Sequence, residues 1–186
     1  MTFQASLYGE TIEQILALDG GGCRAMPLVC AGCTSPKAKS LLAGKRPADL
    51  FPGAPSPEGA LSGLWLYFGC FEECHEICQE LPTADGSYWH AILHRQEPDP
   101  GNAGYWFRRV GRHPVYPVLV ECVRAIVSRD AAVTFNVAKE WNPFAFIDFC
   151  ERAQRQADDA PAHRAALAIQ LAEWQLLFDS CARPVQ

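Results

Sequence analysis

Apolar residues recur every three or four positions from Glu58 onward, which is the spacing of one face of an α-helix. The first such stripe reaches about Leu81 and ends at Pro82, because proline cannot continue a helix. Its members are Leu61, Leu64, Phe68, Phe71, His75 and Cys78. The pattern predicts a helical segment over this whole stretch.

Turn residues divide the rest of this region into further helices. Gly86 and Ser87 open a helix that runs through Glu97, and the Pro98-Asp99-Pro100 turn closes it. Asn142 followed by Pro143 is an N-cap with proline at the first helical position. The other predicted helices run from Asn102 to Val110, from Pro117 to near Asp130, from Asn142 to about Ala157 and from Pro161 to Cys181.

Residues 1–57 are rich in glycine and proline and predict loops with two short helices, about Thr11 to Leu18 and Pro36 to Ala43. Only Ala131 to Ala138 shows the alternation of a strand, and it is short. We therefore expect an all-α protein of about seven helices, in a bundle or in stacked helical hairpins. The helical core would cover 58–186, with the loop-rich segment 1–57 packed on it in a single domain.

Composition excludes several classes of protein. Hydrophobic residues make up 49% and charged residues 20% of the 186, which is typical of a globular chain. The 16 Lys and Arg against 21 Asp and Glu give a net charge of −5, so no nucleic acid or anionic membrane is expected as a partner. No apolar run approaches the roughly 20 residues that span a bilayer, and no basic segment suggests a signal peptide. We expect a cytoplasmic protein.

The nine cysteines are an odd number, and several lie within apolar helical patterns, so we expect reduced and mostly buried thiols. Cys30 and Cys33 form a single Cys-x-x-Cys pair, without the second pair of a structural zinc site or the βαβ context of a redox motif. Cys70, Cys74 and Cys78 share one helical stripe, which favours packing over binding of a soft metal.

A glycine-rich string, Leu18-Asp19-Gly20-Gly21-Gly22-Cys23-Arg24, resembles the oxyanion loop of patatin-like phospholipases. That resemblance implies a serine nucleophile within a Gly-x-Ser-x-Gly elbow. The serine is missing here, because Ser62 in Gly59-Ala60-Leu61-Ser62-Gly63 is out of register. We interpret the three glycines as a flexible turn.

The densest group of chemically active side chains lies between Glu72 and Pro114. His90 and His94 are one helical turn apart and Glu97 continues the same face, so the three could bind a divalent transition metal. His75 could face them from the preceding helix, since a short loop makes the two helices antiparallel neighbours. The spacing of the two histidines matches a zincin, but Ala91 stands where that motif has its glutamate.

Part of this segment resembles one shared by uncharacterised bacterial and fungal proteins. The matching run extends from Gly86 to Asp99 and continues through Asn102-Ala103 and from Tyr105 to Gly111. The resemblance covers about Leu61 to Pro114 and implies no known activity, cofactor or substrate.

Two functions remain open at this point. The first is a pocket for a polar or anionic small molecule, used for binding or catalysis. Its proton-transfer or metal-binding candidates are His75, His90, His94 and Glu97. Its ligand contacts would be Arg95, Arg109, Trp89 and Trp106. The second is a non-catalytic helical module that binds a partner protein, in which these side chains form an internal hydrogen-bond network. Neither reaction type nor oligomeric state follows from the sequence.

Overall fold

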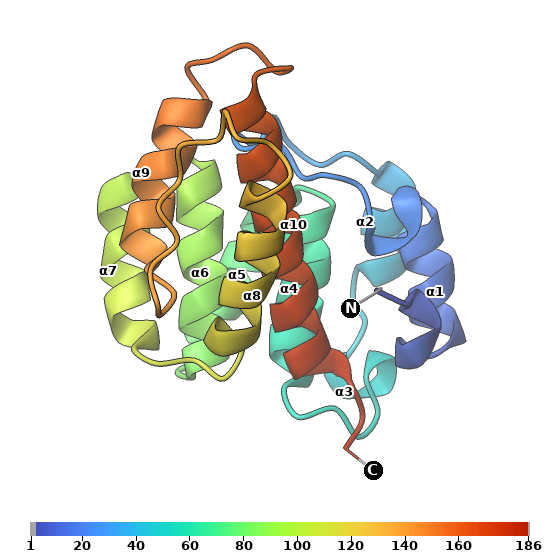
Figure 1. Cartoon of the computed structure of the whole chain (residues 1–186). Helices are drawn as coiled ribbons and strands as arrows, with labels where there is room; N and C mark the ends of the chain where they lie inside the picture. The colour runs from blue at the N-terminus through green and yellow to red at the C-terminus, as the bar shows by residue number, and fades with distance from the viewer. Residues whose placement is uncertain (1–2, 186) are drawn as a thin grey trace.

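The computed structural model describes residues 3–185 of the chain (Figure 1). This range contains ten α-helices and two short 3-10 helices joined by loops. No strand is present in this range, and the Ala131 to Ala138 stretch is a loop. The α-helices are α1 (Glu10–Ala17), α2 (Pro36–Leu42), α3 (Pro47–Leu50), α4 (Pro57–Tyr67), α5 (Phe71–Glu80), α6 (Ala84–Gln96), α7 (Pro100–Val110), α8 (Tyr116–Val127), α9 (Pro143–Ala153) and α10 (Pro161–Ala182). The all-α prediction is confirmed, but there are more helices than the seven expected.

Local sequence explains where many of these helices begin. Thr83 Oγ1 accepts a hydrogen bond from the backbone of Gly86 at the start of α6. At the start of α9, Asn142 Oδ1 accepts from the amides of Phe144 and Ala145, and Pro143 follows it as predicted. These side chains satisfy amides that have no partner within the first helical turn.

The apolar stripe from Leu61 to Cys78 is split between two helices, α4 and α5, which pack against each other. The break lies at Gly69, whose φ of +68° favours glycine. A Cβ atom there would also lie 2.6 Å from the carbonyl oxygen of Gly32. The single continuous helix predicted from the periodicity is therefore wrong. Residues 59–67 of α4 are buried on all sides, whereas Phe71 and His75 of α5 are only partly buried.

Helix α10 lies at the centre of the molecule and packs on α4, α8 and α9 (Figure 1). Its Trp174 and Phe178 rings stack with centroids 4.9 Å apart and are fully buried. Segment 3–57 contributes Ile12 and Leu16 to the same core. A second apolar cluster lies between α8, α9 and the first half of α10.

None of the helices in the described range is both long enough and apolar enough to cross a membrane.

Candidate metal centre

Three histidines from two neighbouring helices converge between α5 and α6. His75 projects from α5, and His90 and His94 project from successive turns of α6. One ring nitrogen of each lies within 4.8 Å of the others. The predicted approach of His75 to the other two is therefore confirmed. The converging set is the three histidines, whereas the sequence pattern had grouped His90 and His94 with Glu97.

His90 is the most enclosed member of this histidine cluster. It is 2% exposed, and neither of its ring nitrogens has a hydrogen-bonding partner in the described chain. Trp106 of α7 covers it, with the two rings stacked at 3.9 Å between centroids. Burial lowers the pKa of His90 to about 3, and His94 and His75 add to the shift, so the ring is neutral at physiological pH. A neutral imidazole offers a lone pair to a ligand.

Glu97 lies at the edge of the cluster, at the end of α6. Its Oε2 is 2.9 Å from Nδ1 of His94, and its side chain is 42% exposed. His94 Nδ1 nevertheless forms no hydrogen bond in the described chain, so Glu97 supplies negative charge beside His94 but does not fix the orientation of its ring.

The expected ligand contacts are separated in the structure. Trp106 borders the histidine cluster, and the Arg109 guanidinium lies over the Trp106 ring at 5.2 Å. Trp89 is fully buried against α4, where a Cβ on Gly63 would lie 2.7 Å from its ring. Trp89 therefore packs the core, and it does not share a site with Arg109.

Arg95 belongs to a buried ion pair between α6 and α10. Its Nη2 lies 2.5 Å from Oε2 of Glu173, and the two side chains are 1% and 0% exposed. Tyr88 donates a hydrogen bond of 2.9 Å to the other carboxylate oxygen of Glu173. Because Arg95 is already paired within this buried network, it is not free to contact a ligand. Sequence reasoning missed Glu173, although an acid next to Trp174 on an apolar helix stripe is a signal for a buried pair.

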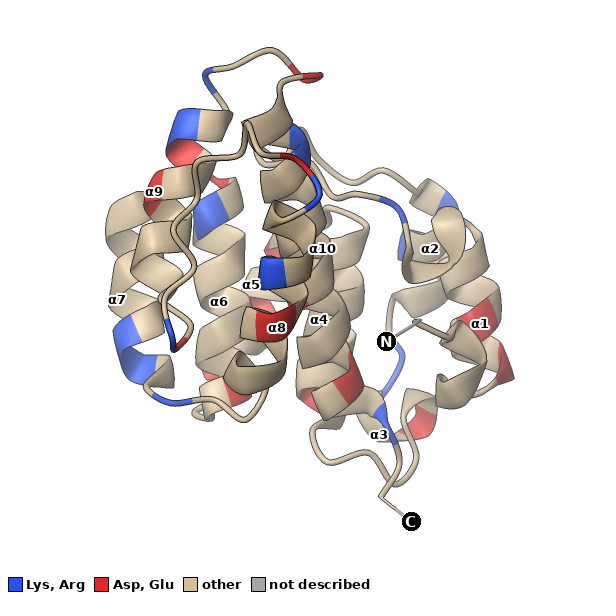
Figure 2. Cartoon of the chain, viewed as in Figure 1, with Lys and Arg blue, Asp and Glu red and all other residues tan. Residues whose placement is uncertain are grey.

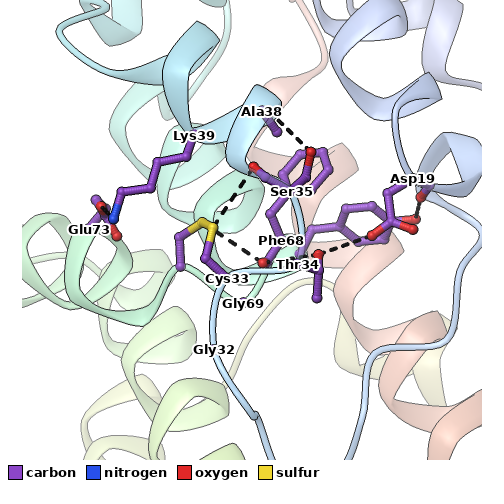
Figure 3. The surroundings of a disulfide bond; sticks show 12 residues. Asp19, Gly32, Cys33, Thr34, Ser35, Ala38, Lys39, Phe68, Gly69 and Glu73 are labelled. Carbon is purple, nitrogen blue, oxygen red and sulfur yellow. Dashed lines mark hydrogen bonds and ion pairs between the residues drawn. A yellow bond between two sulfur atoms is a disulfide. The ribbon is translucent and has the colours of Figure 1, made fainter.

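The expectation of fully reduced thiols is wrong for one pair, because Cys33 forms a disulfide with Cys70 at the start of α5 (Figure 3). The loop containing Cys33 is held there by a 2.7 Å hydrogen bond from the Thr34 amide to the Phe68 carbonyl. Lys39 and Glu73 form an ion pair of 2.6 Å beside it. All three cysteines of the predicted packing stripe are buried in the core as expected, although Cys70 is there as part of the disulfide.

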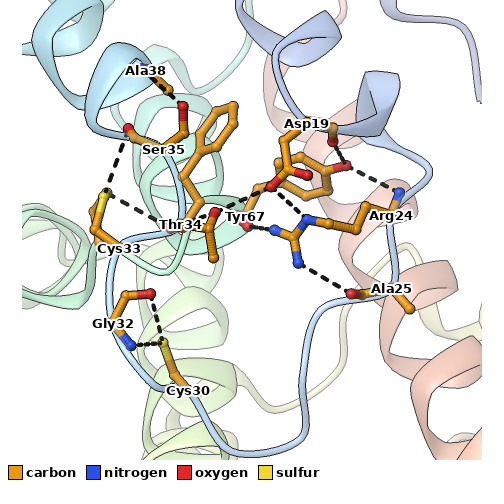
Figure 4. Close-up of polar contacts among 12 residues, drawn as sticks. Asp19, Arg24, Ala25, Cys30, Gly32, Cys33, Thr34, Ser35, Ala38 and Tyr67 are labelled. Atoms are coloured by element: carbon orange, nitrogen blue, oxygen red, sulfur yellow. Dashed lines mark hydrogen bonds and ion pairs between the residues drawn. A yellow bond between two sulfur atoms is a disulfide. The ribbon is translucent and has the colours of Figure 1, made fainter.

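The glycine-rich loop is a structural turn. Gly20, Gly21 and Gly22 all have positive φ, and a Cβ on Gly22 would lie 2.2 Å from the Phe3 ring. On either side of it, Asp19 and Arg24 form an ion pair of 2.6 Å, and the Tyr67 hydroxyl donates to the Asp19 carbonyl (Figure 4). These contacts tie the turn to the end of α4, and they account for the glycines without an oxyanion hole.

No protein-family model matches the chain, and neither a curated protein nor a solved structure matches it. The resemblance of the 61–114 segment to bacterial and fungal proteins stays a prediction.

Proposed function

We propose that this protein binds a divalent transition metal through His75, His90 and His94. The observation that carries the proposal is the buried His90 ring, which has two unpartnered nitrogens and two further imidazoles beside it. An unsatisfied buried polar atom costs about 1–3 kcal/mol. A metal ion bound to one of these nitrogens would offset part of that cost.

The size of the cluster suits such an ion. Three nitrogens no more than 4.8 Å apart have a common centre within about 2.8 Å of each. Zinc–nitrogen bonds are about 2.0–2.1 Å long. Rotations that move each nitrogen by less than about 1 Å would therefore close the ligand set. Three imidazoles favour zinc, copper, nickel or iron over magnesium or calcium, which prefer oxygen ligands.

The surrounding charges permit a cation. Arg95 lies on the same helix as two of the ligands, but Glu173 neutralises its charge at 2.5 Å. Glu97 brings a negative charge to the outer side of His94. A three-histidine centre leaves a fourth coordination position for water or a bound solute, as catalytic zinc sites do. His75 and His94 are only partly buried, so this position would be reached from their side.

Metal analysis and thermal unfolding test this proposal directly. Protein treated with a chelator should take up one equivalent of zinc or cobalt. Metal at about 100 times its Kd adds about 2.7 kcal/mol to the free energy of unfolding. At about 2–4 °C per kcal/mol for a domain of this size, the melting temperature should rise by about 5–10 °C. Cobalt should also give the visible absorption of a nitrogen-ligated ion.

Two variants separate this site from adventitious binding. His94→Gln should abolish the metal-dependent shift and the cobalt spectrum. His163→Gln is the matched control, because His163 lies on α10 and contacts the Ala153 carbonyl instead of the histidine cluster. An equal metal response in wild type and His94→Gln would contradict the proposal. An equal loss of the metal-dependent shift in His94→Gln and His163→Gln would also contradict it.

A further inference from the structure

A cavity of about 980 Å³ lies between the end of α7, the start of α8 and the loop before α9. Smaller cavities within residues 3–185 include one between Phe3 and α10 and one beside the disulfide. None of the three is lined by a histidine of the proposed metal centre. We call this space the α7–α8 cavity. Its volume is at the upper end of the range for small-molecule sites.

The walls of the α7–α8 cavity are cationic. Arg108 and Arg112 line it from α7 and the turn that follows, and Lys139 lines it from the loop before α9. None of these three forms an ion pair with any residue from 3 to 185, and Glu140 is the only acid in the lining. Figure 2 shows basic residues gathered at the C-terminal end of α7 and in the loop after it. All three are exposed to solvent, and together they give this part of a chain of net charge −5 a local excess of positive charge that favours an anion.

Aromatic side chains form another part of the cavity lining. Tyr116, Trp141 and Phe144 all line the cavity, and Phe144 is 41% exposed although it is a large apolar side chain. The Arg108 guanidinium lies 6.0 Å from the Phe144 ring, so cationic and aromatic groups alternate around one space. A flat ring would find stacking surfaces within reach of the arginines.

Two polar atoms of the wall have no partner. The Tyr116 hydroxyl and Nε1 of Trp141 are buried and make no hydrogen bond in the described chain. Burial raises the pKa of Tyr116, and the charge of Glu173 adds to the shift, so the hydroxyl keeps its proton and can donate. Both donor atoms are shielded from solvent, so neither would contact a ligand without rearrangement of the wall, and an anion would be held by the three cations.

We propose that the α7–α8 cavity binds a small aromatic anion, with its carboxylate or phosphate held by Arg108, Arg112 and Lys139 and its ring against Trp141 and Phe144. This site is independent of the metal centre, because Trp106 stacks on His90 while Phe107 and Arg108 line the cavity. Helix α7 thus serves two sites from opposite faces.

Isothermal titration calorimetry with four probes tests this proposal. Naphthylacetate and adenosine monophosphate each combine a ring with an anion, and whichever binds tighter identifies a carboxylate or a phosphate as the preferred head group. Naphthylacetamide has the ring without the charge, and inorganic phosphate has the charge without the ring. At least one of the two aromatic anions should bind saturably with a Kd below about 1 mM. It should bind at least about tenfold tighter than naphthylacetamide or inorganic phosphate.

The variants assign the binding to this cavity. Arg112→Gln and Lys139→Gln should each weaken the better aromatic anion at least about fivefold. Arg155→Gln should not, since Arg155 is also exposed and forms no ion pair with residues 3–185, but it lies beyond α9. Phe144→Ala should weaken the aromatic anion and leave any phosphate binding unchanged. Circular dichroism would confirm that each variant is folded.

Three results would overturn the proposal. One is the absence of saturable binding by both aromatic anions, and another is equal affinity for naphthylacetamide, which would indicate an apolar groove. The third is an equal loss in Arg155→Gln and Arg112→Gln. None of these outcomes bears on the metal centre, which is read out by metal uptake.

Discussion

The buried pair of Arg95 and Glu173 should be the most sensitive polar contact in the protein. Burial acts to lower the pKa of Arg95, but the charges of Glu173 and Cys150, the hydrogen bond to Glu173 and the charge of Tyr88 together outweigh it and raise the pKa overall, so the arginine stays charged. The change Glu173→Gln removes that compensation and leaves a guanidinium that is 1% exposed. Its Nε and Nη1 already have no partner in the described chain. Breaking a buried pair in this way costs about 3–5 kcal/mol.

Urea unfolding measures this cost as a lower midpoint at an unchanged slope. The melting temperature should fall by about 10 °C. The matched control is Asp130→Asn, since Asp130 and Arg164 form a pair of 3.3 Å whose side chains are 38% and 57% exposed. That change should cost less than about 1 kcal/mol. Replacing both partners of the buried pair by methionine should recover most of the loss. If Glu173→Gln costs no more than Asp130→Asn, the reasoning fails.

Three further predictions follow from the fold and the histidine cluster. In chelator, stability should be constant above pH 6.5 and fall towards about pH 3, because the unfolded chain protonates His90 first. The free energy of unfolding should fall with a slope that approaches about 1.4 kcal/mol per pH unit. A His90→Phe variant that lost as much stability as wild type between pH 6.5 and about pH 3 would refute this. Mass spectrometry and thiol titration in denaturant should find seven thiols and one disulfide, and nine thiols would contradict the pairing. The change Cys70→Ser should lower the free energy of unfolding by about 3–4 kcal/mol. Gly69→Ala should destabilise more than Gly44→Ala, since both have positive φ but only Gly69 also meets a carbonyl; equal effects would contradict the predicted clash.

The sequence determined the helical class and most helix starts, because capping side chains and prolines act within one turn of the backbone. Asn142 and Pro143 begin α9 where predicted, and the apolar stripe of α10 identified Trp174 and Phe178 as buried. The spacing of His90 and His94 likewise placed them on one face of α6. These features depend on residues no more than a few positions apart.

Tertiary structure alone decided which distant groups meet. The Gly32 carbonyl leaves no room for a Cβ at Gly69, and the disulfide depends on the same loop lying beside α5. Glu173, 78 residues from Arg95, turned an expected ligand contact into a buried ion pair. Helix periodicity fixes the face on which a side chain lies but not the helix that will cover it. That choice arises from packing of the whole core around α10.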